Sequence, residues 1–161
     1  MAGLDAYDPL PALCLTGSGR FQDVVSWLAS DGVACCMIGQ GDVLRRFRLA
    51  PVAGRWSMLL VDLDDLGGIA AVIDDLVAIR AAVPDLPVLP FTQDTEADDL
   101  SHLRLAICDA TLKLPVSQTR LDVALCETQQ NNAAWQARQP GTIGSKRPAG
   151  RLVLSRLTPA V

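Results

Sequence analysis

The sequence predicts an α/β fold in which a doubly wound parallel sheet is covered by helices on both faces. Two observations lead to this prediction. Apolar runs of strand length, such as Val33–Ile38 and Leu86–Phe91, are bounded by polar or turn residues, as in strands buried on both faces. Between these runs lie longer segments whose apolar residues recur three and four positions apart, which is the period of a helix. Strands that alternate with helices form parallel sheets.

Five strands and the helices between them are expected along the chain. The strands are expected at Ala12–Thr16, Val33–Ile38, Ser57–Asp62, Leu86–Phe91 and Ala110–Leu112. Helices are expected at Phe21–Leu28, around Val43–Phe47, at Ile69–Val83, around Leu100–Ala106, and after the N-cap residue Ser117 with Leu121, Ala124 and Leu125 facing inward. Pro90 fits its strand poorly, because proline cannot donate a ladder hydrogen bond.

Charge divides the chain of 161 residues into a body and a tail. Residues 10–137 are expected to form one domain, and the chain up to residue 137 carries 9 basic against 18 acidic residues, a net charge of −9. The tail, residues 138–161, carries five basic residues and no acid. We expect it either to add an edge strand at Arg151–Leu157 or to be partly disordered. Only 4% of the residues are aromatic, which argues against nucleic-acid binding by base stacking.

Several other classes of protein are disfavoured by simple counts. No apolar run approaches 18 residues, so we expect no membrane span. The N-terminus lacks a basic region followed by a hydrophobic one, so the cytoplasm is the expected location. Five cysteines without a CxxC spacing, and His102 as the single histidine, predict buried reduced thiols rather than a metal site.

Three polar residues are expected where neighbouring strands end, namely Asp62, Thr92 and Lys113. The carboxyl ends of parallel strands meet at one edge of the sheet, so these side chains should share a crevice. A carboxylate, a hydroxyl and an ammonium together suit phosphoryl transfer, in which the carboxylate is the nucleophile. The simpler alternative is a salt bridge between Asp62 and Lys113, with Thr92 capping a helix.

Several stretches carry a family resemblance that spans about residues 10–130. They are Leu59–Leu63, Ile79–Val88, Phe91–Thr92, Asp109–Val116 and Leu121–Leu125. Their order and spacing resemble the response-regulator receiver domain. The resemblance implies a flavodoxin-like, three-layer fold with strand order 2-1-3-4-5. It also implies that Asp62 is the phospho-acceptor, Thr92 the switch hydroxyl and Lys113 the lysine that contacts the phosphoryl group.

The sequence departs from the receiver pattern at the positions that make the site work. The family carries a pair of acids after its first strand to hold Mg²⁺, and the sequence here reads Thr16-Gly17-Ser18-Gly19. Any Mg²⁺ would then rest on Asp62, a backbone carbonyl and Asp64 or Asp65, which is a poor octahedral site. The loop after Asp62 is also about two residues short, which makes Asp64 the alternative acceptor.

Two further departures lie on the fifth strand. The aromatic switch residue of the family is replaced by Ala110, and Leu114 separates Lys113 from Pro115. We therefore expect a degenerate receiver that is not an enzyme, needs no cofactor, and binds Mg²⁺ only if it is competent for phosphorylation. Its function would be protein–protein interaction in signal transduction, with a histidine kinase or an output protein as partner. A homodimer through the fourth helix, fifth strand and fifth helix is a further expectation.

Two alternatives remain open at this point. The first is a working receiver that is phosphorylated on Asp62. The second is a small-molecule-binding or enzymatic domain on the same fold. A dinucleotide-binding loop at Gly17-Ser18-Gly19 is less favoured, because the third glycine of that motif is missing and Val33–Ile38 ends in no acid for a ribose.

Overall fold

The computed structural model describes residues 11–15, 19–38 and 56–140. Within these ranges the strands are β1 (Ala12–Leu15), β2 (Cys35–Ile38), β3 (Leu59–Asp62), β4 (Val88–Thr92) and β5 (Leu112–Lys113). The helices are α1 (Gln22–Ser30), α3 (Ile69–Ala82) and α4 (Gln118–Ala137), with 3-10 turns at Gly19–Phe21, Asp64–Leu66 and His102–Arg104. The strands form one parallel sheet in the order β2-β1-β3-β4-β5, which confirms the predicted topology.

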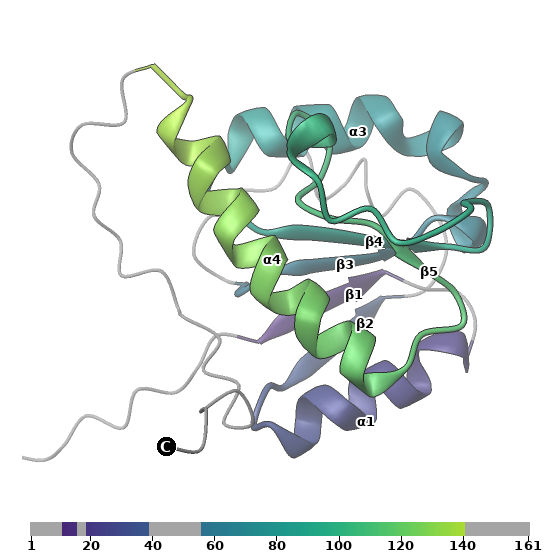
Figure 1. Cartoon of the computed structure of the whole chain (residues 1–161). Helices are drawn as coiled ribbons and strands as arrows, with labels where there is room; N and C mark the ends of the chain where they lie inside the picture. The colour runs from purple at the N-terminus through teal and green to yellow at the C-terminus, as the bar shows by residue number, and fades with distance from the viewer. Residues whose placement is uncertain (1–10, 16–18, 39–55, 141–161) are drawn as a thin grey trace, which may run out of the picture.

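The sheet separates two layers of helix (Figure 1). Helices α1 and α4 cover one face, and α3 covers the other. All four residues of β3 are buried because alternate side chains enter opposite layers. Leu60 belongs to the apolar cluster under α1 and α4, whereas Leu59 and Val61 belong to the cluster under α3. This is the burial pattern expected of a central parallel strand.

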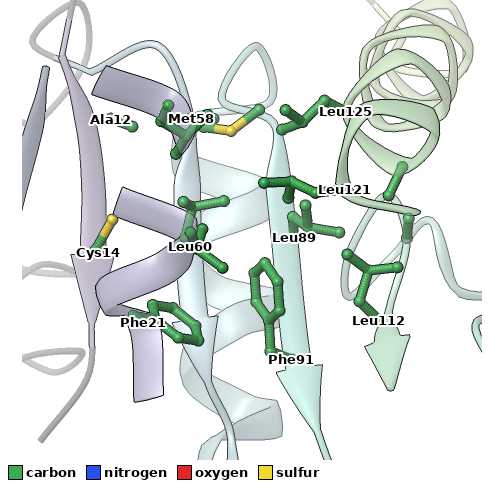
Figure 2. Packing of buried hydrophobic residues seen from close by; sticks show 14 of the residues in the cluster. Ala12, Cys14, Phe21, Met58, Leu60, Leu89, Phe91, Leu112, Leu121 and Leu125 are labelled. Atoms are coloured by element: carbon green, nitrogen blue, oxygen red, sulfur yellow. The ribbon is translucent and has the colours of Figure 1, made fainter. Parts of the chain in front are cut away.

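The cluster under α1 and α4 includes two aromatic rings, which lie at one end of it (Figure 2). Phe21 and Phe91 meet edge-on, with ring centroids 4.7 Å apart and an interplanar angle of 65°. Aromatic pairs prefer this geometry because the positive edge of one ring meets the negative face of the other. Phe21 therefore anchors the chain just before α1 against the end of β4.

Local sequence signals explain where the helices begin and end. Gly32 adopts φ of 80° directly after α1, where a residue with a side chain would be strained. Before α3, Gly67 and Gly68 adopt φ of 91° and 87°. The hydroxyl of Ser117 accepts a hydrogen bond from the backbone N–H of Arg120 at 3.4 Å, which confirms the predicted cap of α4. The predicted inner face of α4 is also confirmed: Leu121, Ala124 and Leu125 are buried.

Pro90 is tolerated in β4 because its backbone nitrogen points toward β5 and not toward β3. The backbone carbonyls of Val88 and Thr92 accept hydrogen bonds from Asp109 and Leu114, on the β5 side. Backbone groups alternate along a strand, so Pro90, midway between them, also directs its nitrogen toward β5. The ladder with β5 comprises only the pairs that follow Pro90, so its missing N–H leaves the longer β3–β4 ladder intact.

The helix expected around Leu100–Ala106 is absent, and that prediction was wrong. The segment forms only the 3-10 turn His102–Arg104. Leu103, which was expected to face the core, is 90% exposed, whereas Leu105 is buried. The face predicted for α3 is also partly wrong, because Ile69 is 41% exposed and Arg80 takes a buried position instead. The buried position of Arg80 is explained by an ion pair.

This ion pair joins Arg80 on α3 to Asp109, just before β5. The guanidinium donates to both carboxylate oxygens of Asp109 at 2.8 and 2.9 Å. It also donates to the carbonyls of Leu105 and Leu86, and it lies 5.1 Å from the ring of Trp135. Burial raises the pKa of Asp109 to about 6, although the charge of Arg80 acts to lower it.

The cysteines only partly follow the prediction of buried thiols. All five are free. Cys14 and Cys108 are buried and Cys35 is half-buried, but the prediction is wrong for Cys36 and Cys126, which are exposed. No cluster of three or more histidine, cysteine or acidic residues is arranged to hold a metal ion in the described ranges. No helix within the same ranges is both long and apolar enough to cross a membrane.

Three sequence predictions lie outside the described residues. They are the turn at Gly17–Ser18, the helix around Val43–Phe47 and the structure of the tail from residue 141 onward.

Candidate functional site

The three residues predicted from sequence end neighbouring strands at one edge of the sheet. Asp62 is the last residue of β3 and lies opposite Phe91 of β4. Thr92 is the last residue of β4 and lies opposite Lys113, the last residue of β5. The parallel register therefore brings all three to the carboxyl edge, where ligands bind in open α/β sheets.

Their side chains nevertheless have separate partners. The hydroxyl of Thr92 donates to a carboxylate oxygen of Asp64 at 2.6 Å, and the backbone N–H of Gln93 donates to the other oxygen at 2.9 Å. The ammonium of Lys113 donates to the carbonyl of Glu96 at 3.1 Å. The simpler alternative, a salt bridge between Asp62 and Lys113, is therefore not formed.

Asp62 instead forms an ion pair with Arg20, a residue that the sequence analysis did not consider. Arg20 donates to Asp62 at 3.1 Å, to Asp65 at 2.8 Å and to Asp64 at 3.4 Å. One guanidinium thus contacts all three carboxyl groups that follow the apolar run of β3. Its side chain is 33% exposed, whereas that of Asp62 is fully buried. The cluster of Arg20, Asp62, Asp64 and Asp65 is called the acid cluster below.

The position of Arg20 follows from the turn that precedes α1. Arg20 lies in the 3-10 turn Gly19–Phe21, and the ring of Phe21 is buried against Phe91. Phe21 therefore fixes the backbone beside the carboxyl edge, within reach of the end of β3. The available sequence signal was a basic residue in the connection between β1 and α1, because that connection leaves the carboxyl edge of the sheet.

The backbone after Asp62 folds around its carboxylate. One oxygen, Oδ1, accepts from the backbone N–H groups of Asp64 at 3.1 Å and Asp65 at 3.3 Å, in addition to Arg20. The other oxygen, Oδ2, is buried and has no hydrogen-bond partner among the described residues. The turn Asp64–Leu66 then ends at Gly67, whose φ of 91° allows the chain to enter α3.

Opposing effects determine the charge states in the acid cluster. Burial raises the pKa of Asp62, and the hydrogen bond from Asp65 and the charge of Arg20 offset this only in part. Partial burial of Arg20 acts to lower the pKa of its guanidinium, but the attraction of Asp62 and Asp65 outweighs this and raises it. Arg20 is therefore a permanent positive charge held against three acidic groups.

The residues of the acid cluster do not fit a Mg²⁺ ion. Magnesium requires several unoccupied oxygen ligands in a near-octahedral arrangement. Asp62, Asp64 and Asp65 each accept hydrogen bonds from Arg20, and Asp64 also accepts from Thr92 and Gln93. Oδ2 of Asp62, which has no partner in the described ranges, is buried and offers a cation a single ligand. Arg20 supplies the positive charge beside these carboxyl groups.

A second polar network holds Lys113 away from the acid cluster. Asp98 accepts the backbone N–H of Lys113 at 2.8 Å and forms a bidentate pair with Arg120 at the start of α4. Arg120 also donates to the carbonyls of Lys113 and Pro115. The hydrogen bond from Arg120 and that from Lys113 lower the pKa of Asp98. The loop after β4 is thus fastened to β5 and α4, and it places the carbonyl of Glu96 next to the ammonium of Lys113.

Comparisons with known proteins identify the fold. No protein-family profile matches the sequence, and no curated protein matches it. Among solved structures, a response-regulator receiver domain from Clostridium thermocellum is 20% identical, with a TM-score of 0.54, and the match covers 78% of this chain and 98% of that chain.

Two further solved structures give the same result. A CheY-like receiver domain protein from Methanospirillum hungatei is 14% identical, with a TM-score of 0.54 and coverage of 78% of this chain and 98% of that chain. The signal receiver domain of an HD domain-containing protein from Pseudomonas fluorescens is also 14% identical, with a TM-score of 0.54 and coverage of 86% and 100%. The chain therefore has the flavodoxin-like fold of response-regulator receiver domains.

Proposed function

We propose that this chain is a degenerate receiver that acts by contact with other proteins, and not by metal-dependent phosphorylation of Asp62. The observation that supports the proposal most strongly is the position of Arg20, which contacts Asp62, Asp64 and Asp65 together. The receiver-like fold supports a role in signal transduction, and we expect the module to work in the cytoplasm without enzymatic activity of its own.

The environment of Asp62 disfavours attack on a phosphoryl donor. Phosphoryl transfer depends on positive charge that neutralises the transferred group and on an exposed nucleophile aligned with the leaving group. Oδ1 of Asp62 already accepts three hydrogen bonds, and Oδ2 is buried. The nearby positive charge belongs to Arg20, which is already bound to the carboxyl groups. Asp62 would have to leave this arrangement before it could react.

Incubation with acetyl phosphate and Mg²⁺, followed by intact mass measurement, tests the proposal. We expect no added phosphoryl group on the wild-type chain under conditions that fully modify a working receiver domain run in parallel. An adduct that disappears in Asp62→Asn would contradict the proposal. Asp64→Asn is the matched control, because it removes the neighbouring carboxylate and reveals whether Asp64 is the acceptor instead.

The second candidate function is a working phospho-acceptor receiver. It is favoured by the position of Asp62 at the end of β3 and of Thr92 at the end of the neighbouring strand. In this case Mg²⁺ would have to displace Arg20 from the carboxylates during the reaction. The same mass measurement separates the two candidates, and an adduct that forms faster in Arg20→Ala would favour this second one.

The partner would be a histidine kinase, an output protein or a second copy of the chain. The contact surface that we propose is formed by the turn His102–Arg104, by β5 and by α4, where Leu103 is 90% and Val123 46% exposed. Sedimentation of Leu103→Asp and Val123→Asp tests the homodimer. We expect both substitutions to shift a dimer toward monomer, while Val77→Asp on the exposed face of α3 leaves the mass unchanged.

A further inference from the structure

A pocket opens at the carboxyl edge of the sheet between α1 and the segment that follows β5. Its apolar lining includes Val24 and Trp27 from α1, and Leu114 and Val116 from the chain before α4. Val24 and Leu114 are almost fully buried, with exposures of 2% and 7%, so they form the floor. Arg20 lies on the wall, which places the pocket directly beside the acid cluster.

The charges around this pocket select its occupant. Asp23 lines the pocket and is exposed, and Arg20 faces three carboxyl groups with a single positive charge. The lining itself balances Asp23 against Arg20, and the acid cluster beside it, with three carboxyl groups around that one guanidinium, makes the surroundings of the pocket acidic. A matching occupant carries apolar side chains for the floor and basic groups for the rim. Trp27 adds an aromatic surface on which a guanidinium can stack.

One segment of this chain has that composition. Residues 151–157 read Arg-Leu-Val-Leu-Ser-Arg-Leu, with four apolar side chains and two arginines. Residues 141–161 as a whole contain four basic residues and no acid, whereas residues 1–140 carry 10 basic and 18 acidic residues. The attraction is thus intramolecular, between a basic segment and an acidic body.

The length of the intervening chain also fits. Helix α4 begins at Gln118, two residues after Val116 of the pocket lining. Its 20 residues span roughly 30 Å, so the helix carries the chain far from the pocket (Figure 1). The ten residues from 141 to 150 can extend by at most roughly 33–36 Å. A chain that leaves the end of α4 can therefore return along the helix and bring Arg151 to the carboxyl edge.

We propose that Arg151–Leu157 docks in the pocket between α1 and the β5–α4 connection of the same molecule. Its apolar residues lie over Val24 and Leu114, and its arginines face Asp23 and the acid cluster. In this position the segment covers the carboxyl edge next to Arg20. A protein partner that approaches this edge must displace it.

Paramagnetic relaxation in the full-length chain tests the proposal. A nitroxide is attached at Ser155→Cys after the exposed Cys36 and Cys126 are changed to serine. The three tryptophan indole N–H signals then report on three places: Trp27 in the pocket, Trp56 before β3, and Trp135 near the end of α4. We expect the Trp27 signal to be weaker with the oxidised label than with the reduced label. The Trp56 signal should have the same intensity in both samples.

A pair of charge-matched variants gives the control. Arg151→Glu with Arg156→Glu should restore the Trp27 signal, whereas Lys146→Glu with Arg147→Glu makes the same charge change in the connecting residues and should leave the loss in place. Three results would overturn the proposal: an unaffected Trp27, a loss confined to the amides of β2, or a loss that disappears on dilution with unlabelled protein. The second would show an added edge strand, and the third docking between copies. None of these outcomes depends on whether Asp62 is phosphorylated.

Discussion

Arg20 influences the ionisation of Asp62, because in the described part of the chain it is the basic side chain that contacts this buried carboxylate. Burial raises the pKa of Asp62, and the charge of Arg20 is one of the influences that hold it down. Replacement by a neutral residue removes that influence, so Arg20→Gln should raise the pKa of Asp62 further. A pH titration of the side-chain carboxyl carbon by NMR measures the change directly.

The matched control for this titration is Arg104→Gln. Arg104 pairs with Asp99 at the surface, at 3.3 Å, and its loss removes a positive charge without touching β3. It should leave the pKa of Asp62 where it was. An equal rise in both variants would mean that net charge, and not the contact with Arg20, sets the ionisation of Asp62.

Arg80 and Asp109 form the other residue pair with a large expected effect. Both side chains are buried, with exposures of 1% and 0%. Removal of one partner strands the other charge away from water, which costs about 3–5 kcal/mol. Arg80→Met should therefore lower the free energy of unfolding by that amount, as measured by urea denaturation.

A double substitution separates the cost of the stranded charge from the value of the pair. Arg80→Met with Asp109→Leu leaves neither charge buried, so it should destabilise the protein less than Arg80→Met alone. Arg104→Ala, at the exposed pair with Asp99, should cost no more than about 1 kcal/mol. If the double variant loses more unfolding free energy than Arg80→Met and Asp109→Leu lose together, the carbonyls around Arg80 matter more than its charge.

At the scale of elements, the loop after β4 is held by Asp98, and this contact should respond to pH. The hydrogen bond from Arg120 lowers the pKa of Asp98 in the folded chain. A carboxyl group whose pKa is lower in the folded than in the unfolded chain stabilises the fold at pH values above the unfolded pKa. This stabilisation disappears as the pH falls through the folded pKa. The loss of stability caused by Asp98→Asn should therefore be largest near pH 7 and should shrink below about pH 4.

Urea denaturation at pH 7, 5 and 3 measures this dependence, with Arg120→Gln as the companion variant. Because the two side chains act as a pair, the double variant should be about as stable as either single one at pH 7. A cost for Asp98→Asn that stays constant from pH 7 to pH 3 would show that the carboxylate charge contributes nothing to the loop.

Elements with a strong local signal could be predicted from the sequence, and those set by distant contacts could not. Helix α4 was predicted because Ser117 caps it and its apolar residues share one face. The strand order followed from the receiver resemblance. The burial of Arg80 on α3 was not predicted, because it depends on contacts with the carbonyl of Leu105 and the carboxylate of Asp109, 25 and 29 positions away. No local periodicity reports such a contact.

The same limit applies to the candidate site at the scale of the whole molecule. The sequence placed Asp62, Thr92 and Lys113 correctly at one edge, since strand ends follow from the topology. It did not show that Arg20, 42 positions before Asp62, would reach the carboxylate. That contact depends on the fold as a whole, because β1 and β3 are neighbours in the sheet although they are far apart in the chain.

The response of the whole molecule to Mg²⁺ is the final prediction. A ligand that binds only the folded state raises the unfolding temperature, and the stabilisation grows with the logarithm of one plus the ratio of free ligand to its Kd. Because Arg20 contacts Asp62, Asp64 and Asp65, wild-type protein should gain no more from MgCl₂ than from NaCl of equal ionic strength. Arg20→Ser leaves three carboxyl groups without that cation, so Mg²⁺ should stabilise the variant more than the wild type. Differential scanning calorimetry with both salts makes the comparison, and a rise specific to MgCl₂ in the wild type would show that a metal displaces the arginine.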